Sequence, residues 1–255
     1  MIKYLLLPLI VLFASCNSTH KGKISLTNRP IYKVHKASSN INIDGKLEDL
    51  SWEKAEAKTF DYYYLTEKEE EKQKSTFRML WDEKNIYIHY DFEDKYINAA
   101  ETKRDGAPYL DDCGEIFLIP APNGENIHYC FEINPNKAVN DLVYVNDFYN
   151  GENVAIRSFD PAIQVEVTIN GTLNNNTDID KGWTLEMAIP HNTFNAVANQ
   201  FPIQKGSQWA FLALRQLRDD NNIGRRMMST IFPVDDVKEK DVHQPAMFGL
   251  LEFVD

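Results

Sequence analysis

The sequence lacks several features that would place it in familiar classes of protein. It contains no Gly-rich phosphate-binding loop and no regular alternation of strand and helix signals, so nucleotide-binding folds are excluded. Basic residues are in the minority, with 27 Lys and Arg against 38 Asp and Glu. The net charge of −11 argues against nucleic acid and anionic lipid head groups as partners, and a neutral ligand or a cation is expected instead.

No apolar run reaches the ~20 residues that a membrane-spanning helix needs. Near the start of the chain, Lys3 precedes the apolar segment Leu5–Phe13, and the small residues Ala14-Ser15-Cys16 follow it. This layout is typical of a secretory signal. We therefore expect a signal peptide over residues 1–16.

The signal ends in Phe-Ala-Ser-Cys, which resembles the lipobox of bacterial lipoproteins. In these proteins the cysteine is acylated and becomes the mature N-terminus. The resemblance implies lipid on Cys16 and a chain anchored in the cell envelope, either periplasmic or surface-exposed. An ordinary signal peptide with a chance cysteine is the alternative. After the signal we expect a polar tether over residues 17–29 and a single domain over residues 30–255.

Only two cysteines follow Cys16, and the predicted strand register keeps them apart. The turn signal Asn123-Gly124 lies between two apolar runs and predicts a β-hairpin in which opposed residue numbers sum to about 247. Cys113 and Cys130 are then four residues out of register, roughly 13 Å along a strand. Because a disulfide needs a Cα separation of about 4.4–6.8 Å, we expect two free, buried thiols.

Short strand signals dominate the rest of the chain, and no helical pattern exceeds about two turns. The expected strands are Ile31–Lys36, Thr76–Trp81, Ile86–Phe92, Ile116–Ile119, Ile127–Ile133, Asp141–Val145, Ile163–Ile169, Trp183–Ile189, Trp209–Leu217 and Phe248–Phe253. They predict an all-β antiparallel sandwich, jelly-roll or immunoglobulin-like in general architecture, or a flattened barrel. About 225 residues suit one domain of this kind.

Six short motifs follow one another along the chain, namely Ile43–Leu47 with Trp52, Trp81–Ile88, Phe92–Asp94, Asp111–Leu118, Gly182–Pro190 and His243–Gly249. They resemble, in the same order, the motifs of family 9 carbohydrate-binding modules. Over about residues 40–253 the chain therefore resembles this family. The resemblance implies a β-sandwich that holds a sugar between aromatic side chains, with polar groups bonded to its hydroxyls and structural metal ions, commonly calcium.

The resemblance further implies an extracytoplasmic carbohydrate-binding lipoprotein. Such a protein would hold a glycan, of the plant polysaccharide type or its chain ends, for neighbouring glycan-degrading enzymes. The sequence departs from the family in one respect, because none of its four tryptophans is clearly positioned as a ligand platform. Trp52 and Trp183 lie in framework motifs, while Trp81 and Trp209 lie at strand ends.

Sugar recognition needs flat apolar faces and planar polar groups that bond neighbouring hydroxyls. The expected ligand-binding residues are Arg104, Tyr109, Asp112, Glu115, Arg215, Arg218 and Phe232. Two alternatives remain open at this point. Tyr109 would otherwise be an ordinary rim aromatic, and Arg215 would otherwise form an internal ion pair with Asp112 or Glu115. Arg226 is expected to be solvated.

Other chemistries compete with simple binding. Asp112 and Glu115 are the candidates for a catalytic pair, because glycosidases hold two carboxyl groups ~5 Å or ~6.5–9.5 Å apart. Known modules of the resembled family are non-catalytic, so we expect no catalytic residue, and a glycoside hydrolase is the first alternative. Haem held by His243 and nearby methionines is the second. Candidate calcium ligands are Asp91, Asp94 and Asp235.

Overall fold

The computed structural model describes residues 26–122, 127–145, 154–194, 201–218 and 225–255. The predicted signal, Cys16 and the Asn123-Gly124 turn lie outside these ranges. None of the helices within them is long and apolar enough to cross a membrane.

Strands make up most of the described chain. They are β1 (Ile31–Lys36), β2 (Lys58–Thr59), β3 (Tyr62–Tyr64), β4 (Ser75–Trp81), β5 (Asn85–Glu93), β6 (Cys113–Ile119), β7 (Ile127–Ile133), β8 (Val139–Val145), β9 (Val154–Ile156), β10 (Gln164–Asn170), β11 (Gly182–Pro190), β12 (Gln208–Arg218), β13 (Arg226–Thr230) and β14 (Gly249–Phe253). The helical elements are single turns, namely η1 (Leu50–Lys54), η2 (Glu69–Glu71), η3 (Pro108–Leu110), α1 (Val237–Lys240) and η5 (Pro245–Met247).

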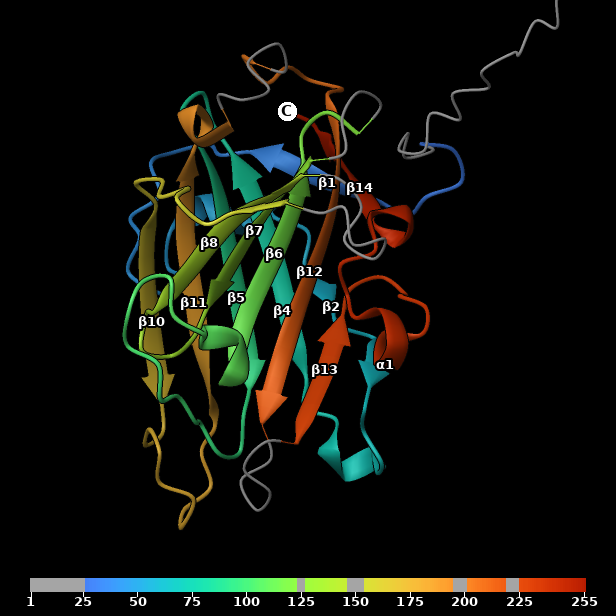
Figure 1. Ribbon diagram of the computed structural model, residues 1–255. Coiled ribbons are helices and arrows are strands. Elements are labelled where there is room, and N and C mark those ends of the chain that lie inside the picture. Colours follow the sequence, from blue (N-terminus) through green and yellow to red (C-terminus); the bar gives the residue numbers. More distant parts are fainter. Residues whose placement is uncertain (1–25, 123–126, 146–153, 195–200, 219–224) are drawn as a thin grey trace, which may run out of the picture.

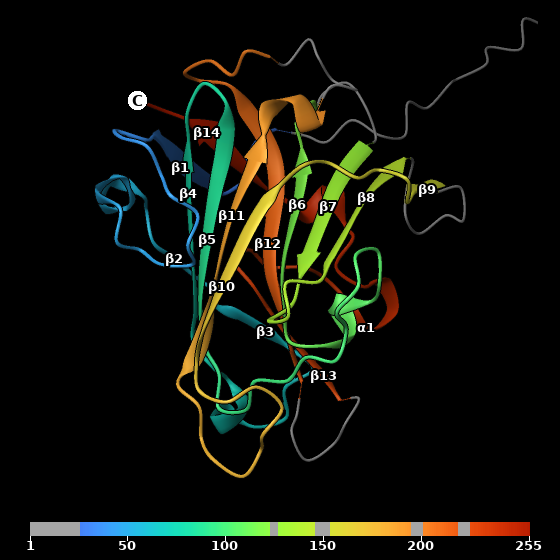
Figure 2. The ribbon, with the colours of Figure 1, turned by 90° about the vertical axis from the view of Figure 1, so that its left-hand side faces the viewer.

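The strands form two packed layers (Figures 1 and 2), which confirms the predicted all-β sandwich. The first layer has the order β10-β11-β5-β4, with β2 at the edge of β4. The second layer has the order β14-β12-β6-β7-β8-β9, with β13 and β3 following β12 on a branch. The pairing between described strands is antiparallel, as expected, except at one strand. Strand β1 pairs in parallel with β4 and with β14 and so joins the layers into one curled sheet.

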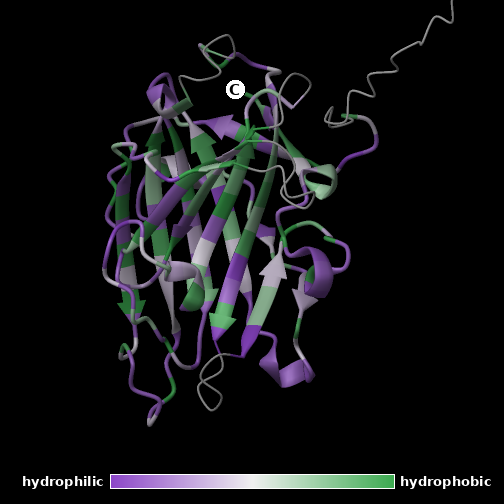
Figure 3. Ribbon diagram, in the orientation of Figure 1, coloured by the Kyte–Doolittle hydropathy of each residue, from purple (hydrophilic) through white to green (hydrophobic). Residues whose placement is uncertain are grey.

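All ten predicted strands are present, although four short ones escaped prediction. Strands β2, β3, β9 and β13 have five residues or fewer. Segments of this length hold too few alternating residues to show a period of two. Figure 3 shows apolar residues concentrated in the strands and polar residues along the loops and α1.

Side-chain alternation on β6 decides which residues face the other layer. An ideal Cβ on Gly114 would lie 3.0 Å from the side chains of Leu185 and Phe92, which belong to the first layer. Even-numbered residues of β6 therefore point into the sandwich, and odd-numbered residues point away from it. We call the side that carries Glu115 and Phe117 the outer face of the second layer.

The core contains all four tryptophans and both cysteines of the described chain. The four tryptophans are at most 5% exposed, so none is available as a ligand platform. The thiols of Cys113 and Cys130 are free and buried, as predicted. Cys130 lies opposite Phe117, which confirms the register of the hairpin over its described strands.

Two of the family-like motifs meet at one carboxylate. Glu186 on β11 accepts hydrogen bonds from the backbone N–H groups of Asp44 (2.8 Å) and Gly45 (2.9 Å). Its other oxygen accepts one from the indole N–H of Trp52 (3.0 Å). Gly45 has a φ of +79°, a conformation that side chains disfavour. These residues therefore form a framework contact that fastens the start of the domain to the first layer.

Candidate ligand-binding site

A pocket of ≈ 390 Å³ lies on the outer face of the second layer. It is lined by Tyr109, Leu110, Glu115, Glu132, Asn140, Tyr144, Arg157, Gln216, Arg218, Arg226, Asp241, Val242 and His243. The floor comes from neighbouring strands β6, β7, β8, β12 and β13, and the rim from η3 and the segment after α1. Figure 2 shows α1 on the side of this layer that faces away from β5. Pockets of 300–1,000 Å³ with converging polar groups are typical of small-molecule sites.

Two carboxyl groups lie side by side on the floor of the pocket. Glu115 on β6 is directly opposite Glu132 on β7, which places the two Cβ atoms about 4.5–5.5 Å apart. Both side chains are buried. Burial is the main reason that the pKa of Glu132 is raised to about 7 and that the pKa of Glu115 is raised well above its usual range; the Glu132 carboxylate adds to the shift of Glu115.

A chain of polar contacts crosses the pocket on either side of these acids. On one side, the guanidinium of Arg226 binds the carboxylate of Asp241 at 3.1 Å and donates to the Gln216 side-chain oxygen at 2.8 Å. On the other side, the amide of Asn140 donates to the Glu132 carboxyl at 2.6 Å. Side chains that could bond several hydroxyl groups are thereby held in fixed positions.

Two tyrosines supply the aromatic surface of the pocket. Tyr109, in η3, is 39% exposed. Tyr144, on β8, stacks on His128 with ring centroids 4.9 Å apart. His128 in turn shares a hydrogen bond of 3.1 Å with His243, whose ring stacks on Phe117. Tyr144 is thus backed by packed rings, while Tyr109 can offer a face to a ligand.

Two polar atoms at the pocket have no hydrogen-bond partner among the described residues. They are Oε1 of Glu115 and Nε of Arg218. Buried polar atoms in native proteins are nearly always bonded, and an unbonded one costs about 1–3 kcal/mol. The Glu115 oxygen and the N–H group at Nε of Arg218 therefore each remain without a partner that a ligand could supply.

A second depression, of ≈ 430 Å³, lies beside the edge strand β10. It is lined by Ile41, Asn42, Ile43, Gln164, Val165 and Glu166. Its single charged side chain, Glu166, already pairs with Lys137 at 3.1 Å, and no aromatic residue lines it. We therefore consider the outer-face pocket the stronger candidate.

Three of the seven predicted ligand-binding residues line the outer-face pocket, namely Tyr109, Glu115 and Arg218. The other four lie elsewhere. Asp112 is fully buried, and its carboxyl accepts backbone N–H groups from Asn98 (2.7 Å) and Arg218 (2.8 Å). It fixes a loop rather than facing a ligand.

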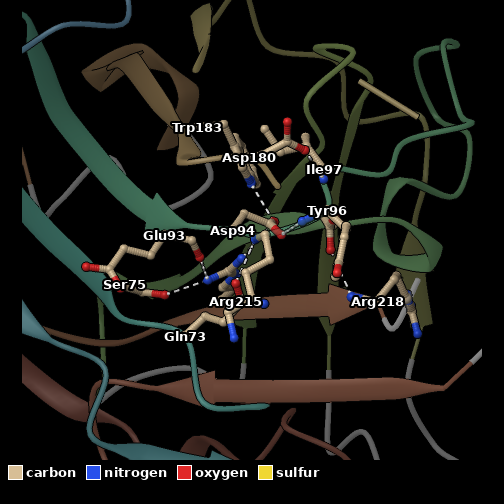
Figure 4. A network of polar contacts seen from close by, with 12 residues as sticks. Gln73, Ser75, Glu93, Asp94, Tyr96, Ile97, Asp180, Trp183, Arg215 and Arg218 are labelled. Atoms are coloured by element: carbon tan, nitrogen blue, oxygen red, sulfur yellow. Dashed lines mark hydrogen bonds and ion pairs between the residues drawn. The ribbon is translucent and has the colours of Figure 1, made fainter. Parts of the chain in front are cut away.

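Arg215 lies inside the sandwich and forms the internal ion pair that was the alternative to a ligand contact (Figure 4). Its partner is Asp94, at 2.7 Å, and not Asp112 or Glu115 as expected. The guanidinium also donates to the Glu93 carbonyl at 2.7 Å and lies over the Phe92 ring. Burial raises the pKa of Asp94, and Arg215 opposes the shift.

Arg104 and Phe232 also lie away from the pocket. Arg104 pairs with the buried carboxylate of Asp141 and with Asp160. Phe232 is 3% exposed and packs edge-on against Phe211 with centroids 5.3 Å apart. Both side chains have partners in the framework, and neither lines the outer-face pocket.

The predicted catalytic pair is not a pair. Asp112 and Glu115 are three residues apart on one extended segment, so their side chains project to opposite faces of the layer. The carboxyl group beside Glu115 is that of Glu132. The predicted solvation of Arg226 is wrong too, because this side chain is paired across the pocket.

The predicted metal and haem residues do not assemble into sites. The carboxylate of Asp94 is paired with the guanidinium of Arg215. Asp91, on β5, and Asp235, between β13 and α1, are exposed and belong to different parts of the fold. Within the described ranges, no three His, Cys, Asp or Glu side chains converge as metal ligands. The ring of His243 stacks on Phe117 and is hydrogen-bonded to His128. This packing does not favour His243 as an axial ligand of haem.

Sequence reasoning missed Glu132, Asn140, Tyr144, Arg157, Gln216 and Asp241. A signal for one of them was present. The predicted sum of 247 that sets Cys130 opposite Phe117 also sets Glu132 opposite Glu115. The others depend on the pairing of β8, β12 and β13 with this hairpin, which no turn signal specifies.

A model of the family described as carbohydrate family 9 binding domain-like matches residues 43–255. Among solved structures, a family 9 carbohydrate-binding module from Caldicellulosiruptor kristjanssonii in complex with cellotriose has a TM-score of 0.60 at 17% identity, covering 88% of this chain and 94% of that one. A family 9 module from the same organism in complex with glucose has a TM-score of 0.59 at 16% identity, covering 87% of this chain and 95% of that one.

A candidate carbohydrate-binding protein from Bacteroides uniformis gives a TM-score of 0.66 at 19% identity, covering 88% of this chain and 99% of that one. At these identities the likeness to solved structures shows the fold. A comparison with curated protein sequences found no match.

Proposed function

This chain belongs to the carbohydrate family 9 binding domain-like family, and from that we propose that it is a carbohydrate-binding protein whose ligand occupies the outer-face pocket. The observation that carries the proposal is the set of unmatched polar atoms beside an exposed aromatic ring. Tyr109 offers a face for the C–H groups of a sugar. The free positions on Glu115 and Arg218 suit hydroxyl groups, which both donate and accept.

The proposal is tested by calorimetric titration with glucose and cellotriose, the sugars found with the structural neighbours. Tyr109→Ala and Glu115→Gln should each weaken binding about tenfold, the effect of losing ~1.4 kcal/mol of contact. Glu166→Gln is the matched control, because it removes the charged residue of the depression beside β10 and should leave the affinity unchanged. The reverse pattern would move the site to β10.

Hydrolysis is the second candidate, and the opposed carboxyls of Glu115 and Glu132 favour it. Retaining glycosidases keep two carboxyl groups ~5 Å apart, but one of them must be ionised to act as the nucleophile. Burial raises the pKa of both groups, that of Glu132 to about 7, and so disfavours the ionised form that a nucleophile needs. Neither group is in an ion pair within the described ranges. We therefore favour binding. Release of glucose from cellotriose, lost in Glu115→Gln, would establish hydrolysis instead.

The setting of the protein is part of the same proposal. We infer a lipoprotein acylated on Cys16, with a tether over residues 17–29, that holds plant-type polysaccharide in the cell envelope for degrading enzymes. The support is the signal and lipobox pattern. Labelling of cells with a palmitate analogue should mark the wild type and not Cys16→Ser. An unlabelled wild type would leave an ordinary secretory signal.

A glycan array tests the ligand class. Plant polysaccharides or their chain ends should give the strongest signals. Strong binding confined to other glycans would contradict the proposed role in plant polysaccharide breakdown while leaving the site intact.

A further inference from the structure

Three guanidinium groups line the outer-face pocket, and only one of them is matched by an acid. Arg226 is paired with Asp241. Arg157 and Arg218 form no ion pair with a carboxylate within the described part of the chain. Two arginines therefore line the pocket without an ion-pair partner among the described residues.

Arg218 is held in place for a ligand by bonds that leave its charge unmatched. Its terminal nitrogen donates to the carbonyl of Tyr109, and its backbone N–H donates to Asp112. Neither bond uses Nε, which has no partner. A side chain fixed in this way loses little conformational entropy when it binds an anion through its remaining N–H donors.

The two acids on the floor do not cancel these charges. Glu115 and Glu132 lie within the layer, and burial favours their neutral forms by raising the pKa of each carboxyl group. At pH 6, below the pKa of about 7 for Glu132, the charged members of the pocket are then mainly Arg157, Arg218 and Arg226 against Asp241. A protonated Glu115 would also donate rather than only accept.

From this arrangement we propose that the pocket selects an anionic sugar, whose carboxylate or sulfate group lies between Arg157 and Arg218 while its hydroxyls meet Asn140 and Gln216. The inference rests on the proposed function and specifies the ligand of the same site. Guanidinium groups bind both anions through paired hydrogen bonds. A neutral sugar would leave both cations unmatched in a partly dehydrated site.

The overall negative charge of the protein does not oppose this selection. The expectation of a neutral or cationic ligand came from the net charge of −11. Exposed charges farther than ~8 Å apart are largely screened at physiological ionic strength. The groups that touch the ligand therefore decide the sign of the charge that it carries.

Three sugars that differ only at carbon 6 test the inference, namely glucose, glucuronic acid and glucose 6-sulfate. We expect calorimetry at pH 6 and 0.15 M salt to show at least one anion binding about tenfold or more tightly than glucose, since one charge-assisted bond exceeds ~1.4 kcal/mol. A preference for glucuronic acid identifies the carboxylate as the natural group, and a preference for glucose 6-sulfate identifies the sulfate.

Variants then assign the effect to the two arginines. Arg157→Gln and Arg218→Gln should each remove most of the preference for the anion. Arg157→Gln should change glucose binding little, whereas Arg218→Gln also removes a donor to the sugar and should weaken glucose binding as well. Arg78→Gln on β4 is the matched control, because it removes the same charge from the other layer. A thermal melt checks that each variant is folded, and Arg157→Gln, which alters an exposed residue, carries the test if Arg218→Gln is unstable.

The outcomes separate the two proposals. Glucose bound as tightly as both anions would overturn the inference and leave carbohydrate binding intact. An anion preference that survives both pocket variants would also overturn it. Failure of all three sugars to bind at millimolar concentration, together with a blank glycan array, would remove the proposed function itself.

Discussion

The two faces of the second layer treat charge in opposite ways. On the inner face of β12, the guanidinium of Arg215 meets the carboxylate of Asp94 at 2.7 Å, and both are 1–2% exposed. On the outer face, one strand away, the carboxyls of Glu115 and Glu132 oppose each other, and two arginines nearby have no acidic partner in the described chain.

The difference separates framework from site. In a buried ion pair each charge compensates the other, so removing one partner is strongly destabilising. Buried polar atoms without a partner instead cost stability in the protein as it stands. Polar groups without partners are tolerated at binding sites because a bound ligand supplies the missing hydrogen bonds. The inner pair therefore stabilises the sandwich, while the outer cluster is arranged for binding, and each prediction below tests that division.

The largest effect is expected on the inner face. Arg215→Met leaves the carboxylate of Asp94 buried without a cation, so the free energy of unfolding should fall by about 3–5 kcal/mol. Urea denaturation measures it. The double variant Arg215→Met with Asp94→Leu should recover much of the loss. A loss below about 1 kcal/mol in the single variant would mean that the ion pair is not part of the framework.

The outer face should make stability depend on pH in a defined direction. The pKa of Glu132 is about 7 in the folded protein against about 4.3 when unfolded. Between these values the folded state holds a proton that the unfolded state has released, so stability is full below pH ~4 and falls as pH rises to ~7. The loss is of order 3 kcal/mol for this group.

Glu132→Gln isolates that contribution. Buried histidines act in the opposite direction, because burial lowers the pKa values of His128 and His243 in the folded protein. Below pH ~6.5 the unfolded chain binds protons on these rings that the folded protein does not, so stability falls as pH falls. The difference in unfolding free energy between wild type and variant therefore carries the effect. A difference that stays constant from pH 4 to 8 would show that the pKa of Glu132 is the same in the folded and unfolded states.

A smaller loss of stability is expected at the edge of the inner face. Arg104→Ala removes the partner of Asp141, a fully buried carboxylate, and should cost about 1–2 kcal/mol because Arg104 itself is one-third exposed. Sugar affinity should not change. The sequence placed Arg104 among the expected ligand-binding residues, so a loss of binding with an unchanged melting temperature would return Arg104 to the site.

The smallest effect is expected in tryptophan fluorescence. All four indole rings are buried and none lines the outer-face pocket. Saturating glucose or glucuronic acid should leave the emission maximum where it is. A saturable shift would indicate that the ligand lies against a tryptophan after all, and so away from this pocket.

Much of the framework could be predicted because local pattern specifies it. Strict alternation predicted β10, and the hairpin register predicted that Cys113 and Cys130 stay apart. The motif with Asp44-Gly45 and Trp52 was recognisable from its residue pattern. The structure gives the reason for the pattern, since Gly45 and Trp52 both donate hydrogen bonds to the carboxylate of Glu186.

The site was harder to predict because it depends on which face a residue occupies and which strand comes next. Arg215 and Gln216 are adjacent in sequence, yet one lies in the core and the other in the pocket. The pairing of β12 with β6 decides this, and the two strands are about 90 residues apart in the chain. Glu115 was found because it lies in a recognised motif, while Asn140 was missed because it does not.

The most direct test of the division between the faces is a crystal structure of the protein soaked with glucuronic acid and, separately, with glucose. We predict density for the sugar in the outer-face pocket, beside Tyr109, within hydrogen-bonding distance of Nε of Arg218 and Oε1 of Glu115. Density beside β10, with this pocket holding only solvent, would contradict the assignment.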